Sequence, residues 1–273
     1  MGSMVGLEQA YFHGYERDEQ HRLIDQVEFW RDRLILNGTT VVPGERLLEI
    51  GSGVGAVLRV LGNAFPGAVL TGIDIAREQV DFARSYLSES GIKADLRVAS
   101  AQDLPFPGAS FDHVWDMWVL QHMASELEAV SVLREARRVL VPGGKITAIE
   151  ADYSTLSIGP RHPAIEAMRA SLMGTFRAFG RSDAGTQLPI WLDQAGYQDI
   201  QPGERLFAYR GTETGPAARY IADLVEMTAE SIASVPGNAD QDTLRLAARR
   251  LRELDSVPGA RLSFVLHKTQ AKA

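Results

Sequence analysis

The sequence contains no cysteine, which excludes disulfides, thiolate zinc sites, iron–sulfur clusters and a cysteine nucleophile. Basic residues are outnumbered: 28 lysines and arginines stand against 35 aspartates and glutamates, for a net charge of −7. This balance disfavours binding to nucleic acid or to an anionic membrane, because both need basic patches. No apolar run reaches the roughly 18 residues that a membrane span needs. We therefore expect a cytoplasmic chain with a small-molecule partner, no nucleic acid and no membrane.

The first 40 residues have the pattern of a helical cap. Between residues 7 and 36 there is no proline, and apolar side chains recur at helical spacing, as at Leu23, Val27, Trp30 and Leu34. We expect residues 1–40 to form an N-terminal helical cap and residues 41–273 to form one α/β domain.

Strands alternate with helices along residues 46–150. We predict strands at 46–50, 68–73, 94–99, 111–115 and 145–150, and helices at 56–64, 77–90 and 125–140. Strands that are separated by helices form right-handed crossovers and a parallel sheet with helices on both faces. The fifth strand would end at Glu150 and Asp152, on the edge where such sheets bind ligands.

Residues beyond 152 follow a different pattern. We predict helices at 163–179 and 190–195, a strand at 198–209, helices at 216–234 and 240–254, and a last strand at 261–267. Two helices before the last strand are more than a sheet requires. We expect this insertion, at about residues 213–257, to cover a substrate together with the N-terminal cap. The same helices could cover a partner subunit instead, so a homo-oligomer stays open.

A glycine-rich turn follows the first predicted strand. Gly51, Gly53 and Gly55 carry no side chain there, so backbone N–H groups and a helix N-terminus can approach an anionic or carboxylate-bearing ligand. Asp74 follows about 20 residues later, at the end of the second strand, where a ribose-binding carboxylate belongs. Two functions fit this pattern: a nicotinamide-dependent oxidoreductase and an S-adenosylmethionine enzyme, because both ligands carry vicinal ribose hydroxyls.

Five segments in order resemble the class I S-adenosylmethionine-dependent methyltransferases, in particular the small-molecule branch of quinone and natural-product biosynthesis. They read LEIGSGVG (48–55), GID (72–74), ASAQDLPF (99–106), FDHVWD (111–116) and LREARRVLVPGG (133–144). The resemblance covers about residues 45–152. It implies a Rossmann-like, doubly wound, seven-stranded and mostly parallel sheet that ends in an antiparallel hairpin. It also implies methyl transfer from S-adenosyl-L-methionine, with S-adenosyl-L-homocysteine as product, to the carbon, oxygen or nitrogen of a small aromatic or apolar metabolite.

The resemblance also implies a set of cofactor-binding residues. Gly51 and Gly53 would approach the methionyl part, Asp74 would bind the ribose hydroxyls, and Ile75 would pack on adenine. Ser100 stands where the family often has an aspartate for the adenine amino group, so that hydrogen bond is in question. The full expected set is Tyr15, Glu49, Gly51, Gly53, Asp74, Ile75, Ser100, Ala101, Gln102, Asp116 and Met117.

Four residues are expected to contact the acceptor, namely Tyr11, Trp118, His122 and Tyr153. Trp118 follows the fourth strand, close to the expected position of the methyl group, but large aromatic side chains also commonly pack in cores. Tyr11 and Tyr15 would close over the cofactor and acceptor, with polar contacts from Arg22 or Gln26. The alternative is that these aromatics anchor the N-terminal helix to the sheet.

Three residues are candidate proton acceptors, namely His122, Glu150 and Asp152. The ordinary pKa of histidine, about 6.5, suits proton transfer at neutral pH, although a single histidine at a helix start can also be structural. Methyl transfer by proximity alone would need no base.

No cluster of carboxylates with an asparagine or histidine appears at metal-ligand spacing, so we expect no metal. Two other functions stay open beside methyl transfer: an NAD-dependent oxidoreductase that uses the same glycine-rich turn, and a non-catalytic cofactor-binding scaffold.

Overall fold

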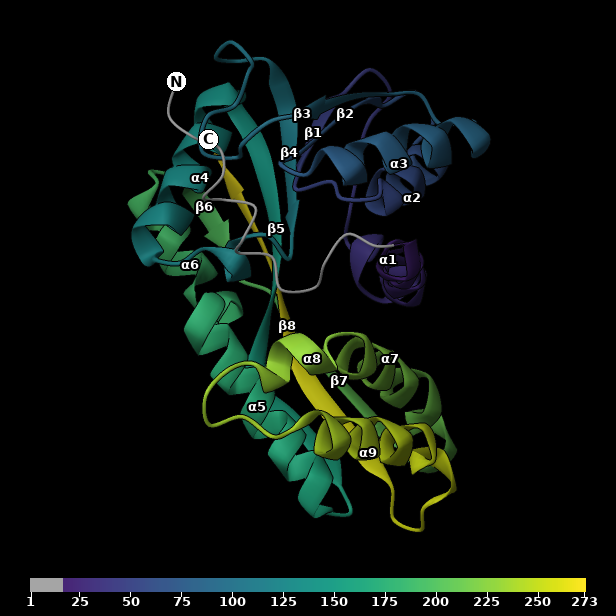
Figure 1. The fold of residues 1–273 in the computed structure, drawn as a ribbon. Helices are drawn as coiled ribbons and strands as arrows, with labels where there is room; N and C mark the ends of the chain where they lie inside the picture. Colours follow the sequence, from purple (N-terminus) through teal and green to yellow (C-terminus); the bar gives the residue numbers. More distant parts are fainter. Residues whose placement is uncertain (1–16) are drawn as a thin grey trace.

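The computed structural model describes residues 17–273, and within them eight strands form one sheet in the order β3-β2-β1-β4-β5-β8-β6, with β7 paired to β8 (Figure 1). Strands β1 to β5 pair in parallel with one another. Strand β8 runs antiparallel to β5, β6 and β7. The strands are β1 (Arg46–Ile50), β2 (Val69–Asp74), β3 (Ala94–Val98), β4 (Phe111–Met117), β5 (Leu140–Gly159), β6 (Gln198–Gln201), β7 (Glu204–Arg210) and β8 (Arg261–Lys272).

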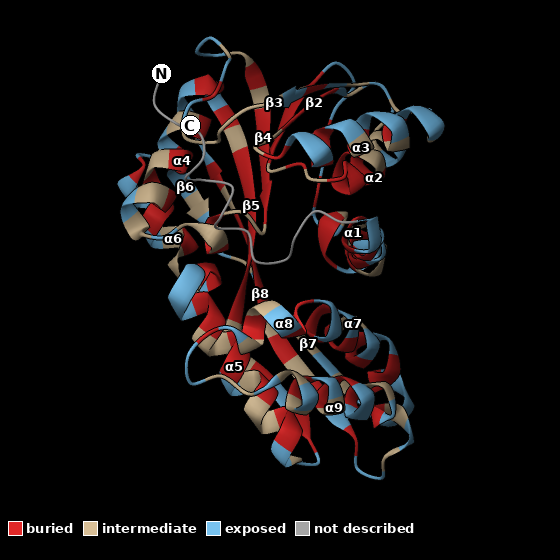
Figure 2. Cartoon of the chain, in the orientation of Figure 1, coloured by how far each residue is buried: buried red, intermediate tan, exposed pale blue. Residues whose placement is uncertain are grey.

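Helices cover both faces of the parallel part of the sheet. Helices α2 (Ala56–Ala64) and α3 (Arg77–Glu89) lie on one face, and α4 (Glu126–Val139) and α6 (Ala184–Gln194) lie on the other (Figure 1). The central strands are therefore covered on both sides (Figure 2), and every residue but one in β1 and in β4 is buried. The expected mostly parallel α/β class is confirmed.

The fifth strand is much longer than predicted, which corrects the expectation that it ends at Glu150 and Asp152. It continues to Gly159 and pairs with β8 on both sides of an irregularity between Asp152 and Ser157. The apolar alternation resumes at Leu156 and Ile158, both buried, and this keeps the strand in the sheet. The far ends of β5 and β8, with β7, carry α5 (Pro163–Phe179), α7 (Thr214–Met227), α8 (Ala229–Ala233) and α9 (Gln241–Arg252) (Figure 1).

The strand predicted at 198–209 is divided into β6 and β7, so the sheet has eight strands where seven were expected. Pro202 and Gly203 separate the two strands, and a Cβ on Gly203 would lie 2.3 Å from the backbone oxygen of Lys268. Proline lacks the N–H that a strand interior needs, and the chain passes too close to β8 for a side chain. The helix predicted at 190–195 begins earlier, at Ala184, and the one predicted at 216–234 is divided into α7 and α8.

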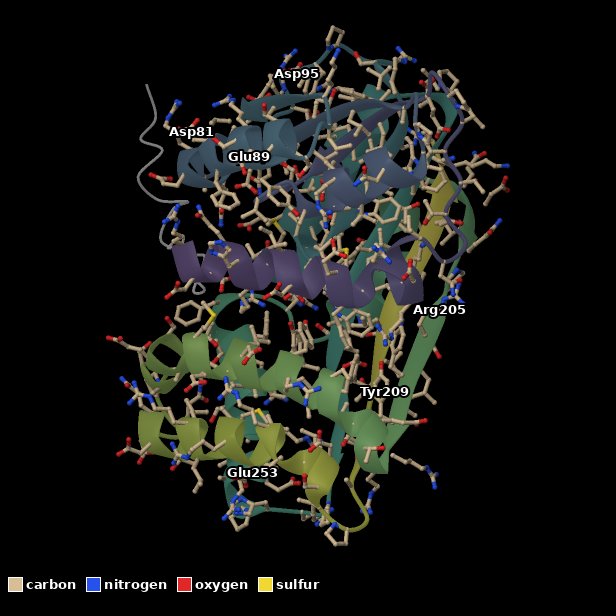
Figure 3. All side chains as sticks on the ribbon, turned by 90° about the vertical axis from the view of Figure 1, so that its right-hand side faces the viewer. Asp81, Glu89, Asp95, Arg205, Tyr209 and Glu253 are labelled. Carbon is tan, nitrogen blue, oxygen red and sulfur yellow. The ribbon has the colours of Figure 1, made fainter. Side chains whose placement is uncertain are left out.

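Helix α1 (Arg17–Trp30) lies between the α2 and α3 pair and α7 (Figure 3). A π-helical turn, Arg31–Ile35, extends it toward the sheet. The buried ammonium of Lys268 on β8 donates to the backbone oxygens of Leu34, Ile35 and Asn37, at 2.7–3.0 Å, and to the Thr39 hydroxyl at 2.7 Å. A cation at the carboxyl end of a helix satisfies carbonyls that have no partner within the helix, so Lys268 fixes α1 to the sheet.

Tyr11 and Tyr15 lie outside the described residues, so their expected roles stay predictions. Among the described helices, none is both long and apolar enough to cross a membrane.

Candidate cofactor and acceptor site

A cavity of about 430 Å³ opens at the carboxyl ends of the parallel strands and reaches the cap helix α1 and helix α7. Its position is the one where α/β sheets of this kind bind ligands. Eleven of the residues predicted from the sequence line it, namely Gly51, Gly53, Asp74, Ile75, Ser100, Ala101, Gln102, Met117, Trp118, His122 and Tyr153.

The glycine-rich turn forms one wall of this cavity. Gly51 and Gly53 have φ values of 63° and 48°, in the left-handed region that favours glycine. A Cβ on Gly51 would lie 2.3 Å from the Val119 side chain, whereas a Cβ on Gly53 would meet nothing within 4 Å. The turn is therefore packed tightly behind Gly51 and open beside Gly53, which leaves room for a ligand next to the N-terminus of α2.

Asp74 connects the end of β2 to this turn. Its carboxylate accepts the backbone N–H of Gly53 at 2.8 Å and that of Ala76 at 2.9 Å. Burial raises the pKa of Asp74, and these N–H groups partly oppose that rise. Each carboxylate oxygen has a second lone pair, so the oriented side chain can still accept two hydroxyl groups. Vicinal ribose hydroxyls fit this arrangement.

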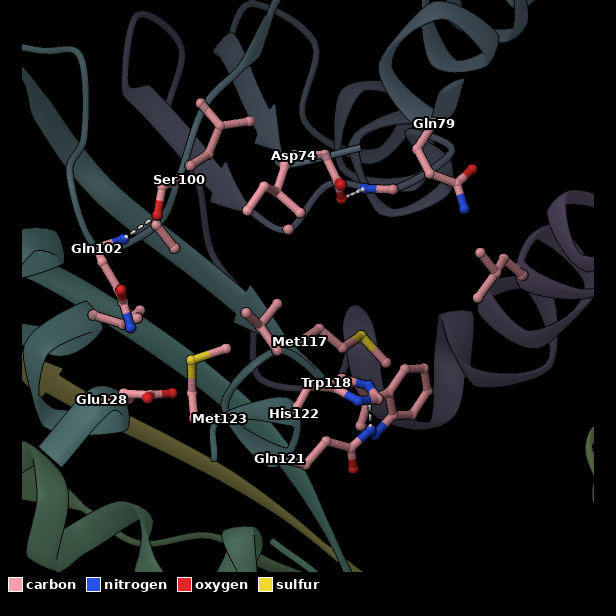
Figure 4. Close-up of a pocket in the computed structure, with 18 of the residues that line it drawn as sticks. Asp74, Gln79, Ser100, Gln102, Met117, Trp118, Gln121, His122, Met123 and Glu128 are labelled. Atoms are coloured by element: carbon pink, nitrogen blue, oxygen red, sulfur yellow. Dashed lines mark hydrogen bonds between the residues drawn. The ribbon is translucent and has the colours of Figure 1, made fainter. Parts of the chain in front are cut away.

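The opposite end of the cavity has apolar walls and a polar edge. Figure 4 shows Ser100, Gln102, Met123 and Glu128 at this end, away from Gln79. The Ser100 hydroxyl accepts the backbone N–H of Gln102 at 3.2 Å. Glu128 was not predicted as a site residue.

The signal that locates Glu128 in the sequence is a capping box at the start of α4. The Ser125 hydroxyl accepts the Glu128 backbone N–H at 3.2 Å, and the Glu128 carboxylate accepts the Ala124 N–H at 3.1 Å. The pattern S-x-x-E therefore predicts the helix start, but not that its glutamate lines a cavity.

Trp118 has a left-handed backbone, with φ of 60°, although it carries a large side chain. Its N–H donates to the Ile149 oxygen at 2.9 Å, which holds this conformation against β5. Such strained residues cost about 1–3 kcal/mol and gather at functional sites. Trp118 lines the cavity and also packs against the core, so both readings of the sequence apply to it.

His122 lies on the 3-10 turn Leu120–His122, with its Nε2 atom 3.4 Å from Nε2 of Gln121. Burial lowers the pKa of His122 to about 4. The imidazole is therefore neutral at pH 7 and a weaker base than the ordinary histidine assumed from the sequence.

Aromatic side chains from distant elements complete this part of the cavity. Tyr153 stacks on Phe176 with ring centroids 4.2 Å apart, and Tyr220 of α7 stacks on Phe29 of α1 at 5.5 Å. Burial raises the pKa of Tyr153 and of Tyr220, so both stay neutral phenols. Tyr220 was missed, because helical spacing alone does not say which face of α7 meets the cavity.

Four predicted carboxylates are not on the cavity wall, namely Glu49, Asp116, Glu150 and Asp152. Glu49, Asp116 and Glu150 are buried, and this burial raises the pKa of each well above its ordinary range. Glu150 accepts the Leu120 N–H at 2.7 Å, and Asp152 accepts the N–H and hydroxyl of Ser154. The structure therefore brings His122 to the cavity but neither Glu150 nor Asp152.

The polar face of α1 also meets the cavity. Arg22 makes two hydrogen bonds to the Glu19 carboxylate, at 2.7 and 2.6 Å, and a third to the Gln26 side chain at 2.6 Å. Arg22 and Gln26 line the cavity, as the sequence suggested, and Glu19 balances the charge of Arg22.

Within residues 17–273, no three histidine, aspartate or glutamate side chains gather closely enough to hold a metal ion. The expectation that the protein uses no metal stays a prediction.

Comparison with known proteins identifies the part of the chain that builds this cavity. Residues 48–148 match the family model described as "Methyltransferase domain". This part of the chain is a methyltransferase domain. The resemblance of the five sequence segments to this family is thereby confirmed.

Two curated relatives of the methyltransferase domain come from different pathways. The chain is 37% identical over 138 residues to 27-O-demethylrifamycin SV methyltransferase of Amycolatopsis mediterranei. This alignment covers 49% of this chain and 48% of that protein. It is 32% identical over 161 residues to ubiquinone biosynthesis O-methyltransferase of Xanthomonas axonopodis pv. citri, covering 57% and 63%. The chain thus spans about half to two thirds of the length of these relatives.

Two solved structures show the same fold as this chain. The [4+2]-cyclase SpnF aligns with a TM-score of 0.56 at 24% identity, covering 90% of this chain and 82% of that one. A SAM-dependent methyltransferase from Aquifex aeolicus aligns with a TM-score of 0.52 at 18% identity, covering 70% and 91%. At this identity the likeness establishes the architecture and not the reaction.

Proposed function

We propose that this protein transfers a methyl group from S-adenosylmethionine to a hydroxyl oxygen of a small, largely apolar or aromatic molecule. The observation that carries the proposal is one continuous cavity that joins the glycine turn and Asp74 to the walls formed by Trp118, Tyr153 and Tyr220. The methyltransferase domain and the two relatives named for O-methylation support the reaction and the acceptor atom.

The chain offers a distinct group for each part of the cofactor. When bound, S-adenosylmethionine supplies an electrophilic methyl group on a positively charged sulfur. The open space beside Gly53 would hold its amino-acid end, and Asp74 would accept hydrogen bonds from its ribose hydroxyls. Ile75 and Ala101 would contact the base, and Met117 would lie near the sulfur.

The cover of the site would come from two parts of the chain. Helix α1 presents Arg22 and Gln26, and helix α7 presents Tyr220 and Leu224. We assign residues 1–40 to a cap and about 213–257 to a cover that together exclude water. Because Glu19 neutralises Arg22, the acceptor side would favour an uncharged molecule over an ion.

His122 is the proposed proton acceptor, because it reaches the cavity whereas Glu150 and Asp152 do not. Its low pKa makes it a weak base, so orientation of the acceptor would contribute more to the rate than proton removal. Glu150 would act indirectly, by holding the turn that carries His122 through the Leu120 N–H.

Isothermal titration tests the cofactor assignment. We expect wild-type protein to bind S-adenosylhomocysteine and Asp74→Asn to bind it at least about 10-fold more weakly, since one charge-assisted hydrogen bond is lost. Asp95→Asn is the matched control, because Asp95 on β3 pairs with Arg97 at the surface and does not line the cavity. If the protein binds NADH and does not bind S-adenosylhomocysteine, the result would favour an oxidoreductase instead.

Turnover separates an enzyme from a scaffold. We expect release of S-adenosylhomocysteine when the protein and S-adenosylmethionine are incubated with a panel of phenols and aliphatic alcohols. Tight cofactor binding with no release across the panel would favour the scaffold.

A further inference from the structure

The end of the cavity beyond Asp74 has the composition of a purine pocket. Ile75 directly follows Asp74, and Ala101, Met123 and Val132 line the same cavity, so flat apolar contact is available. A purine bound there also presents a polar edge, and an adenine edge carries an exocyclic amino group that needs an acceptor.

Two side chains with acceptor oxygens, Glu128 and Gln102, lie at this end in addition to Ser100 (Figure 4). The Ser100 hydroxyl already accepts the Gln102 N–H. The Glu128 carboxylate accepts the Ala124 N–H at 3.1 Å, and a carboxylate has about four lone-pair sites, so it retains acceptor capacity. It is also the acidic side chain of this group, and charge-assisted hydrogen bonds are roughly twice as strong as neutral ones.

We propose that Glu128 is the residue that recognises the 6-amino group of the cofactor's adenine. The inference rests on the proposed function and deepens it. Two contacts fix Glu128 at the start of α4, because the Ser125 hydroxyl accepts its backbone N–H and its carboxylate accepts the Ala124 N–H. Selection of adenine thus comes from the start of α4 rather than from the glycine turn.

A role confined to capping α4 would explain the Ala124 contact but would not discriminate between bases. The decisive experiment is therefore a thermodynamic cycle, measured by isothermal titration on the full chain. Its two probes are S-adenosylhomocysteine and the purine riboside analogue that lacks the 6-amino group. Its variants are Glu128→Met, which removes the acceptor, and Glu128→Gln, which keeps a neutral one and still suits a capping box.

We expect wild-type protein to bind S-adenosylhomocysteine at least about 10-fold more tightly than the analogue, and Glu128→Met to reduce this ratio to about 2 or less. Glu128→Gln should give an intermediate ratio. Glu126→Gln is the matched control. Glu126 lies two residues before Glu128 on α4, its carboxylate accepts a hydrogen bond from the Gln194 side chain at 2.8 Å, and it does not line the cavity. It should keep the wild-type ratio.

Three results would overturn the proposal. The first is a wild-type ratio near 1, and the second is an equal loss of affinity for both probes in Glu128→Met, which would indicate a capping role alone. The third is a collapse of the ratio in Gln102→Met but not in Glu128→Met. Failure of wild-type protein to bind either probe would instead refute the proposed cofactor, so the two failures are distinguishable.

Discussion

The strained backbone of Trp118 can be tested by comparing two small substitutions at that position. Trp118→Ala and Trp118→Gly remove the same indole, so they lose the same packing against the core and the cavity. They differ in whether a side chain must occupy a φ of 60°. Any difference in stability between the two variants therefore reports the backbone.

The magnitude follows from the conformation. The left-handed region costs an L-residue about 1–2 kcal/mol, and glycine avoids this cost. The greater freedom of glycine in the unfolded chain offsets about 0.5–1 kcal/mol of that advantage. We expect Trp118→Gly to be more stable than Trp118→Ala by about 0.5–1 kcal/mol, which reverses the usual order of the two residues.

Urea unfolding followed by fluorescence of the three remaining tryptophans measures the difference. The matched control is Ser85, which is exposed in the interior of α3, where alanine should exceed glycine by about 1 kcal/mol. Both Trp118 variants should retain S-adenosylhomocysteine binding within a few fold. If alanine is the more stable residue at 118 as well as at 85, the backbone there is not strained and our account of this turn is wrong.

Further predictions concern charge, protonation and metals. Burial alone would raise the pKa of Glu45, but hydrogen bonds from His113, the Val42 N–H and Lys145 lower it to about 2. A lowered folded-state pKa stabilises the protein above the unfolded value and is lost as pH falls. Glu45→Gln should therefore cost about 2–3 kcal/mol in urea unfolding at pH 7, and the difference from wild type should shrink as pH falls from about 5 to about 2. A difference that stays constant over this range would contradict this. Because the pKa of His122 is about 4, the pH profile of kcat/KM should show no inflection near pH 6.5. An inflection there that disappears in His122→Ala would show that His122 titrates near its ordinary pKa and would refute the prediction. Lys268→Met leaves buried carbonyls at the end of α1 without a donor and should lower the free energy of unfolding by about 2–4 kcal/mol, whereas an unchanged urea midpoint would show that the anchor is dispensable. Methyl transfer should persist in excess chelator, and its loss would reveal a metal.

The cofactor half of the site could be predicted from the sequence because its chemistry is local. Gly51 and Gly53 occupy a turn that directly follows β1, and Asp74 is the last residue of β2. Parallel strands end on the same edge of a sheet, so two strand ends with the right residues suffice to bring them together. The order of strands and helices up to residue 140 follows from the same short-range patterns, and each boundary there lies within a few residues of the prediction.

The acceptor half could not be predicted in the same way, because distant segments build it. Whether Tyr220 faces the cavity depends on how α7 packs against α1, and whether Glu150 reaches it depends on how β5 continues past the parallel sheet. The sequence predicted ordinary basicity for His122, but its burial, and with it the lowered pKa, arises only in the folded chain.

The sequence by itself thus determined the family, the cofactor turn and the absence of cysteine chemistry, since each depends on residue identity and short spacing. Only the tertiary structure decided which carboxylates are buried under the site and that Glu128 meets the cavity from α4. Burial and side-chain direction depend on contacts between elements that are far apart in the chain, and local patterns carry no information about those contacts.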